Sequence, residues 1–234
     1  MVSETYKEIF QVRQVCRYLP LASLLLLCVP MAKAQSTFDV NLGFGSAHVG
    51  SNGSGIDNGN SLLNAFGPCT PSSGDVNCQA TPGLSGFFLG FGGDIMLNKR
   101  FGMGAEVNLQ PAKSDYGPLQ YRQTFYDFNG IYAPINQKHV MLEFQGGIGG
   151  AKTGFYYSQN SCVGTAVCSN YTQAVGNSNH FQVHAGVGVQ IFLTQHLFIR
   201  PQFDYHYVTN FTEQFGSSSV PQGTIWVGYS FGDR

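Results

Sequence analysis

Acidic side chains recur along this 234-residue chain at positions where an isolated charge would be hard to accommodate. Six carboxylates stand among glycines, amides and apolar residues: Asp39, Asp94, Glu106, Asp127, Glu143 and Asp204. Arg200 is the one clear cation in similar surroundings. A buried charge is costly unless it is paired and hydrogen-bonded. We therefore expect a polar cluster in which Arg200 pairs with carboxylates, with Asp39, Asp94 and Glu143 at a depth similar to its own.

Histidines form the second group that could do chemistry. If "TQH" (194–196) centres a turn, residues whose numbers sum to 390 lie opposite each other. His184 then faces His206 at about 5 Å, a separation that suits a shared metal ion or proton. A satisfied polar pair is the simpler interpretation, and we expect no bound cofactor.

The sequence gives little support for catalysis. His48, Ser46 and Ser51 lie close together in one polar stretch, but a nucleophile elbow is missing. "GFGGD" (90–94) lies inside an extended segment with no helix after it, so it does not indicate a dinucleotide loop. We predict no catalytic residues. An enzyme that modifies outer-membrane lipid is therefore the least favoured of the three functions considered below.

Four cysteines follow residue 35, in two Gly/Ser/Asn-rich stretches: Cys69, Cys78, Cys162 and Cys168. In an exported protein, such cysteines most simply form two local disulfides, Cys69 with Cys78 and Cys162 with Cys168. A metal site is the alternative, but neither stretch has zinc-ribbon spacing or a nearby histidine.

Most of these residues lie in segments where apolar side chains alternate with small or polar ones. The alternation is clear in "HFQVHAGVGVQIFL" (180–193), where Phe181 and Val183 share one face and Gln182 and His184 share the other. A period of two predicts a strand. Eight such segments occur: 38–47, 86–97, 101–110, 119–133, 140–150, 180–193, 197–207 and 224–231.

The connections between these segments alternate in length. Short turns near 98–100, 134–138 and 194–196 alternate with long polar stretches at 48–83, 111–118, 156–178 and 209–222. This alternation around an even number of antiparallel strands is typical of a transmembrane barrel with short periplasmic turns and long external loops.

The composition of the two strand faces indicates how such a barrel is turned. A soluble sandwich or lipocalin-like barrel needs a solvated outer face rich in Lys, Glu and Thr. Here the polar face is mostly glycine with scattered amides, which suits the interior of a narrow eight-stranded barrel. We therefore expect the apolar faces to meet lipid.

The first 34 residues are predicted to be a cleaved secretory signal. A basic lead precedes the apolar run "LPLASLLLLCVPM" and the small-residue pattern "AKA" (32–34), so the exported domain would be 35–234. From Gln35 onward the chain has eight Lys and Arg against eleven Asp and Glu, with no basic run. We therefore expect no nucleic-acid partner.

The eight alternating segments and the closing "TIWVGYSF" (224–231) resemble the eight-stranded OmpA-like and OmpX-like outer-membrane barrel families. This resemblance implies a monomer in the lipid of the outer membrane, with the outer-membrane assembly machinery as a partner that recognises its C-terminal strand. The expected function is envelope structure or contact with extracellular protein or glycan through the loops, where "SLLNAF" (61–66) and "GFYYSQN" (154–160) offer apolar and aromatic groups. A narrow gated pore is the alternative.

Overall fold

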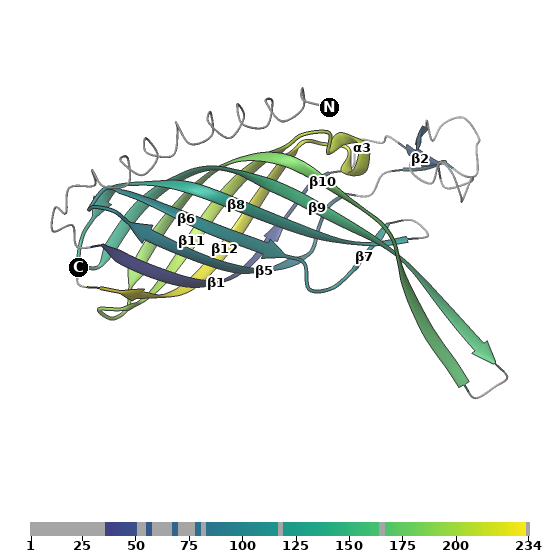
Figure 1. Ribbon diagram of the computed structural model, residues 1–234, viewed down its shortest axis with the longest axis horizontal. Coiled ribbons are helices and arrows are strands. Elements are labelled where there is room, and N and C mark those ends of the chain that lie inside the picture. Colours follow the sequence, from purple (N-terminus) through teal and green to yellow (C-terminus); the bar gives the residue numbers. More distant parts are fainter. Residues whose placement is uncertain are drawn as a thin grey trace, which may run out of the picture. The chain divides into compact units, whose positions relative to one another are not determined.

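The computed structural model describes residues 36–50, 55–57, 67–69, 78–80, 83–116, 119–163 and 167–232 (Figure 1). The predicted signal sequence, residues 1–34, lies outside these ranges. So do "SLLNAF" (61–66) and most of the first long connection.

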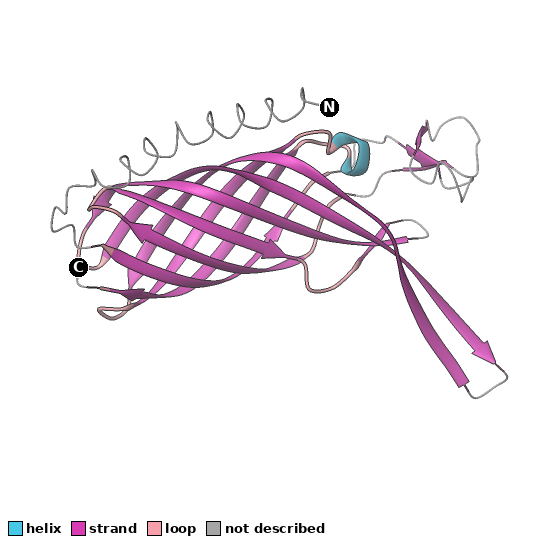
Figure 2. Cartoon of the chain, in the orientation of Figure 1, coloured by secondary structure: helices cyan, strands magenta, loops and turns pink. Residues whose placement is uncertain are grey.

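Eight long antiparallel strands form a closed ring (Figures 1 and 2). The strands are β1 (Thr37–Ala47), β5 (Phe87–Met96), β6 (Phe101–Leu109), β8 (Leu119–Asn136), β9 (Val140–Val163), β10 (Val167–Phe192), β11 (Leu197–Val208) and β12 (Ser219–Phe231). Each strand pairs with its sequence neighbour. The ring closes where β1 pairs with β12, for example Phe38 opposite Phe231. The predicted all-β, eight-stranded up-and-down barrel is confirmed.

The apolar faces of the strands point away from the barrel axis. Large side chains such as Phe128, Phe203 and Phe101 are 69, 54 and 54% exposed, while the alternate residues of the same strands are largely buried. A water-soluble barrel would be turned the other way, with these rows packed together inside. The outer surface instead suits hydrocarbon, and closure leaves no free strand edge within the ring.

Short turns join the strands at one end of the barrel, at residues 97–100, 137–139 and 193–196. At the other end, the described residues of 156–178, expected as a long polar connection, continue the strands β9 and β10. Strands β9 and β10 pair continuously from Ile191 with Val140 to Val167 with Val163, with one irregularity between Ala174 and Gly176. They form a hairpin that extends past the ends of β8 and β11.

The other long connections also contain short elements. Strands β2 (Gly55–Asp57), β3 (Gly67–Cys69) and β4 (Cys78–Ala80) make a small sheet, and β7 (Ser114–Tyr116) pairs with the start of β8. The helix α3 (Thr212–Phe215) ends at Gly216, whose left-handed φ of 78° glycine adopts readily. Among the described residues, no helix is long and apolar enough to cross a bilayer.

Candidate functional site in the barrel interior

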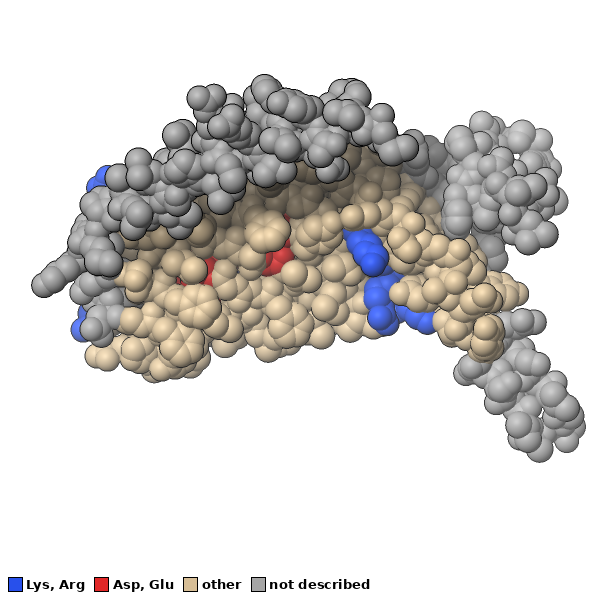
Figure 3. Space-filling view, viewed as in Figure 1, with Lys and Arg blue, Asp and Glu red and all other residues tan. Residues whose placement is uncertain are grey.

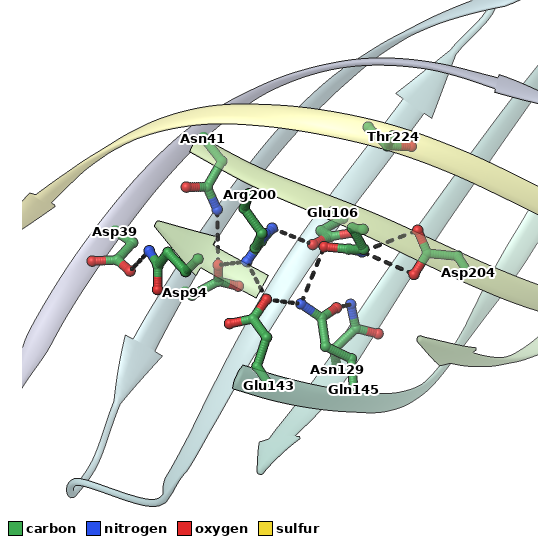
Figure 4. Close-up of polar contacts among 12 residues, drawn as sticks. Asp39, Asn41, Asp94, Glu106, Asn129, Glu143, Gln145, Arg200, Asp204 and Thr224 are labelled. Atoms are coloured by element: carbon green, nitrogen blue, oxygen red, sulfur yellow. Dashed lines mark hydrogen bonds and ion pairs between the residues drawn. The ribbon is translucent and has the colours of Figure 1, made fainter. Parts of the chain in front are cut away.

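Arg200 on β11 is the centre of the barrel interior. Its side chain is fully buried and makes three ion pairs. Nη1 lies 2.7 Å from Asp94 Oδ2 and 2.9 Å from Glu143 Oε1, and Nη2 lies 2.8 Å from Glu106 Oε1. These distances are those of charge-assisted hydrogen bonds. Figure 4 shows the three carboxylates converging on the guanidinium from separate strands.

Side-chain amides extend this network in both directions along the lumen. Asn41 donates to Asp94 Oδ2 at 2.8 Å, and Gln145 donates to Glu143 Oε1 at 2.9 Å. Gln202 bridges two acids, with its Nε2 3.2 Å from Glu106 Oε2 and 2.9 Å from Asp204 Oδ1. Because the amides supply donors that a single arginine cannot, they let several acids share the interior.

Asp39 lies directly opposite Asp94 on the neighbouring strand β1 and accepts a hydrogen bond from Gln190 Nε2 at 3.0 Å. Asp127 accepts one from Gln182 Nε2 at 2.6 Å. The structure therefore brings Asp94, Glu106 and Glu143 to the arginine, and it connects Asp204 to them through Gln202. Asp39 and Asp127 are also buried in the lumen, and each accepts a hydrogen bond from a glutamine amide.

His184 and His206 lie opposite each other on β10 and β11, and their rings stack with centroids 4.8 Å apart. His184 hydrogen-bonds through both nitrogens, Nε2 to Asp204 Oδ1 at 2.8 Å and Nδ1 to Asn129 Oδ1 at 3.1 Å. His206 Nδ1 is 3.9 Å from Asp127 Oδ2, too far for a hydrogen bond. Among the described residues, no group of three or more His, Cys, Asp or Glu is placed to hold a metal ion. A metal-binding role for this pair stays a hypothesis.

The indole of Trp226 fills the lumen beside the arginine. The Arg200 guanidinium carbon is 5.4 Å from the centre of the ring, a cation–π distance. Gly43 and Gly90 leave the space that the indole needs, because a Cβ at either position would come within 2.7 or 2.5 Å of its carbons. The glycines of the inner face are thus fitted to one large side chain.

Apolar clusters close both ends of the polar interior. At the turn end, a small cluster is formed by Met96, Ile131, Ala133, Met141, Phe192 and Phe198. A larger cluster at the hairpin end includes Phe88, Phe125, Tyr116, Tyr121, Phe155, Phe211 and Phe215. In this cluster α3 is held by the Tyr116 hydroxyl, which donates to Gln214 O at 2.6 Å. Burial raises the pKa of the Tyr116 phenol, so the hydroxyl stays a donor.

Sequence reasoning missed the aromatic closure and the bridging amides. The alternation of strand faces could have predicted part of the aromatic closure. Phe88 follows Phe87, which faces outward, and Phe125 precedes Tyr126, which is partly exposed on the outer face. Phe211 and Phe215 carry no such signal, because they lie in and beside a four-residue helix.

The predicted disulfides involve cysteines whose side chains are not among those that the structure describes. The backbone register sets Cys162 directly opposite Cys168. Cys69 and Cys78 lie on β3 and β4, which are separated by β2. Two strand spacings amount to about 9.5 Å, beyond the roughly 7 Å that a disulfide bridges. This arrangement gives no support to a bridge between Cys69 and Cys78.

Comparison with protein families agrees with this architecture. Residues 19–233 match the model of the outer membrane protein beta-barrel domain. The chain belongs to this family. The expected outer-membrane location and the resemblance to outer-membrane barrels are therefore confirmed, and the apolar outer face is the surface that meets membrane lipid.

Solved structures similar to this family member share little sequence with it. The attachment invasion locus protein Ail of Yersinia pestis, solved with the heparin analogue sucrose octasulfate, is 12% identical over 84% of this chain and 99% of Ail, with a TM-score of 0.47. A major outer membrane protein of Thermus thermophilus is 11% identical (84 and 99% covered, TM-score 0.49). OprG of Pseudomonas aeruginosa is 14% identical (86 and 99% covered, TM-score 0.44). No curated protein matched the chain.

Proposed function

We propose that this protein is a closed outer-membrane barrel that acts through its external surface and does not conduct solutes. The observation that carries the proposal is the filled lumen. The Arg200 cluster and the indole beside it occupy the middle of the interior, the two apolar clusters occupy its ends, and these side chains are almost entirely buried. An eight-stranded barrel has room for side chains and little else.

Opening a path would require the network to break. Arg200 would have to leave three carboxylates at once, in surroundings where an uncompensated charge costs several kcal/mol. The aromatic cluster at the hairpin end would also have to separate from α3. Both requirements favour a structural role for the polar cluster, and we propose no catalytic role and no cofactor for it.

The projecting hairpin of β9 and β10 is the proposed contact surface. Tyr157 and Tyr171 are 41 and 60% exposed on strands that pair only with each other at this level. Exposed aromatics among amides and hydroxyls suit contact with an extracellular protein or glycan.

We also propose that a Cys162–Cys168 disulfide stabilises the hairpin near its tip. Residues 1–34 are removed on export, and the protein is a monomer assembled through β12.

Planar-bilayer recording of the purified full chain tests the closed barrel. We expect no discrete conductance steps from the wild type, and steps at ordinary voltages would overturn the proposal in favour of a pore.

For the contact role, cells would carry either the full chain or a variant with 158–172 replaced by a tight turn. If adherence to arrays of glycans and matrix proteins is the same for both, the hairpin is not the contact surface.

A further inference from the structure

Three basic residues gather on the outer face of the barrel, near the end that carries the long connections. Figure 3 shows blue side chains grouped on this face beside the apolar wall. Strands β8 and β9 and the segment before β7 contribute Arg122, Lys152 and Lys113. We propose that these three residues, the outer basic cluster, bind the phosphate groups of lipids in the outer leaflet of the outer membrane.

The register shows that the cluster faces lipid. Lys152 lies opposite Thr124, and Arg122 lies opposite Gly154, one pair further along the same face. This face also carries Phe128 opposite Ile148, which are 69 and 57% exposed. Because side chains on a strand alternate between two faces, Arg122 and Lys152 belong to the lipid-facing set and not to the lumen.

Along the membrane normal, the outer basic cluster lies at the height of the lipid headgroups of the outer leaflet. The turns at the opposite end are short and therefore periplasmic. Lys152 is the thirteenth residue of β9 counted from Val140, and Arg122 is the fifteenth of β8 counted from Asn136. About 9–11 residues of a tilted strand cross the hydrocarbon. Both residues thus lie just beyond it, on the outer side.

The cluster is oriented by uncharged contacts. Arg122 Nη2 donates to Pro111 O at 2.9 Å, and Lys113 Nζ lies 4.5 Å from the ring centre of Tyr156. Within the described ranges, none of the three cations forms an ion pair with a carboxylate, although Asp115 is only two residues from Lys113. Their charge is therefore available to an anion from outside the chain.

The distribution of charge supports the same conclusion. From Gln35 onward the chain has eight Lys and Arg, of which Arg200 is in the lumen and Arg234 lies outside the description. Lys99, Arg100 and Lys138 lie at the periplasmic turns. The remaining three are all in the outer basic cluster. Positive charges collected on one lipid-facing patch at headgroup level match phosphorylated lipid better than a soluble partner.

Titration of the detergent-solubilised full chain with lipopolysaccharide tests this inference. The variant Lys113→Gln/Arg122→Gln/Lys152→Gln is compared with the control Lys99→Gln/Arg100→Gln/Lys138→Gln, which loses the same charge at the other end. We expect about a fivefold loss of affinity for each outer cation removed and little change in the control. Dephosphorylated lipopolysaccharide should bind both variants and the wild type equally weakly.

Unchanged affinity in the outer variant would overturn the proposal, as would an equal loss in the control. The proposal would also be overturned if millimolar inorganic phosphate displaced lipopolysaccharide and the cluster showed no preference for the lipid. The cluster would then be a site for free phosphate. Heat-modifiable gel mobility establishes that each variant is folded. If the triple variant does not fold, the single change Lys152→Gln, at an exposed position, must give the fivefold loss alone.

Discussion

Replacing Arg200 with leucine tests the interior most directly. The substitution removes the only cation among three buried carboxyl groups, whose oxygens lie 2.7–2.9 Å from the guanidinium. Breaking a buried ion pair by removing one partner costs about 3–5 kcal/mol, because the remaining charge is left uncompensated. For a chain of this size, each kcal/mol corresponds to roughly 2–4 °C in the unfolding midpoint, so Arg200→Leu should lower it by about 6–20 °C.

The assay is thermal unfolding in detergent, followed by the gel mobility of unboiled samples. Lys99→Leu is the matched control, since it removes a cation from an exposed turn and should change the midpoint by no more than about 2 °C. Adding Asp94→Asn, Glu106→Gln and Glu143→Gln to Arg200→Leu should restore much of the loss, because no uncompensated carboxylate then remains at the centre. An unchanged midpoint in Arg200→Leu, or no recovery in the quadruple variant, would refute the reasoning.

Three further predictions concern packing and cross-linking. Gly43→Ala should destabilise the barrel by about 1–3 kcal/mol in urea unfolding, because its Cβ would meet the central indole at 2.7 Å, whereas Gly146→Ala, with open space around it, should be neutral. Phe215→Ala should cost about 3–5 kcal/mol in the same assay, since the ring is fully buried in the aromatic cluster. Peptide mapping without reductant should find Cys162 linked to Cys168, and finding both thiols free would contradict the register argument.

The strand faces could be predicted from the sequence because their period is strictly two. In β10, Phe181 and Val183 are exposed while Gln182 and His184 are buried, as the alternation indicates. The sequence predicts residues 156–178 only as a long polar connection, because their Gly, Ser and Asn content gives no sign of a hairpin. Pairing between two strands depends on cross-strand partners, and these are not visible within either segment alone.

The partners of Arg200 were harder to predict than the faces. Counting from the periplasmic ends places Asp39, Asp94 and Glu143 near the arginine, and Asp39 does lie directly opposite Asp94. The same counting does not include Glu106, which makes the third contact with the guanidinium. Closing a barrel staggers the strands around the ring, so a residue at a different sequence depth, here Glu106 on β6, can reach the same guanidinium. The stagger depends on the registers of all eight strand pairs together. These registers cannot be predicted from the sequence of each strand alone.

The same stagger explains what an ionic centre contributes to this barrel. Arg200 on β11 contacts β5, β6 and β9, and β6 lies directly across the ring from it. Sliding any one of these strands by two residues would keep its apolar face toward lipid, so the outer surface alone would tolerate the error. The slide would move the carboxylate by about 6.6 Å and break its bond to the guanidinium. The apolar exterior therefore determines which face points outward, whereas the buried charges favour one set of strand registers over its two-residue alternatives.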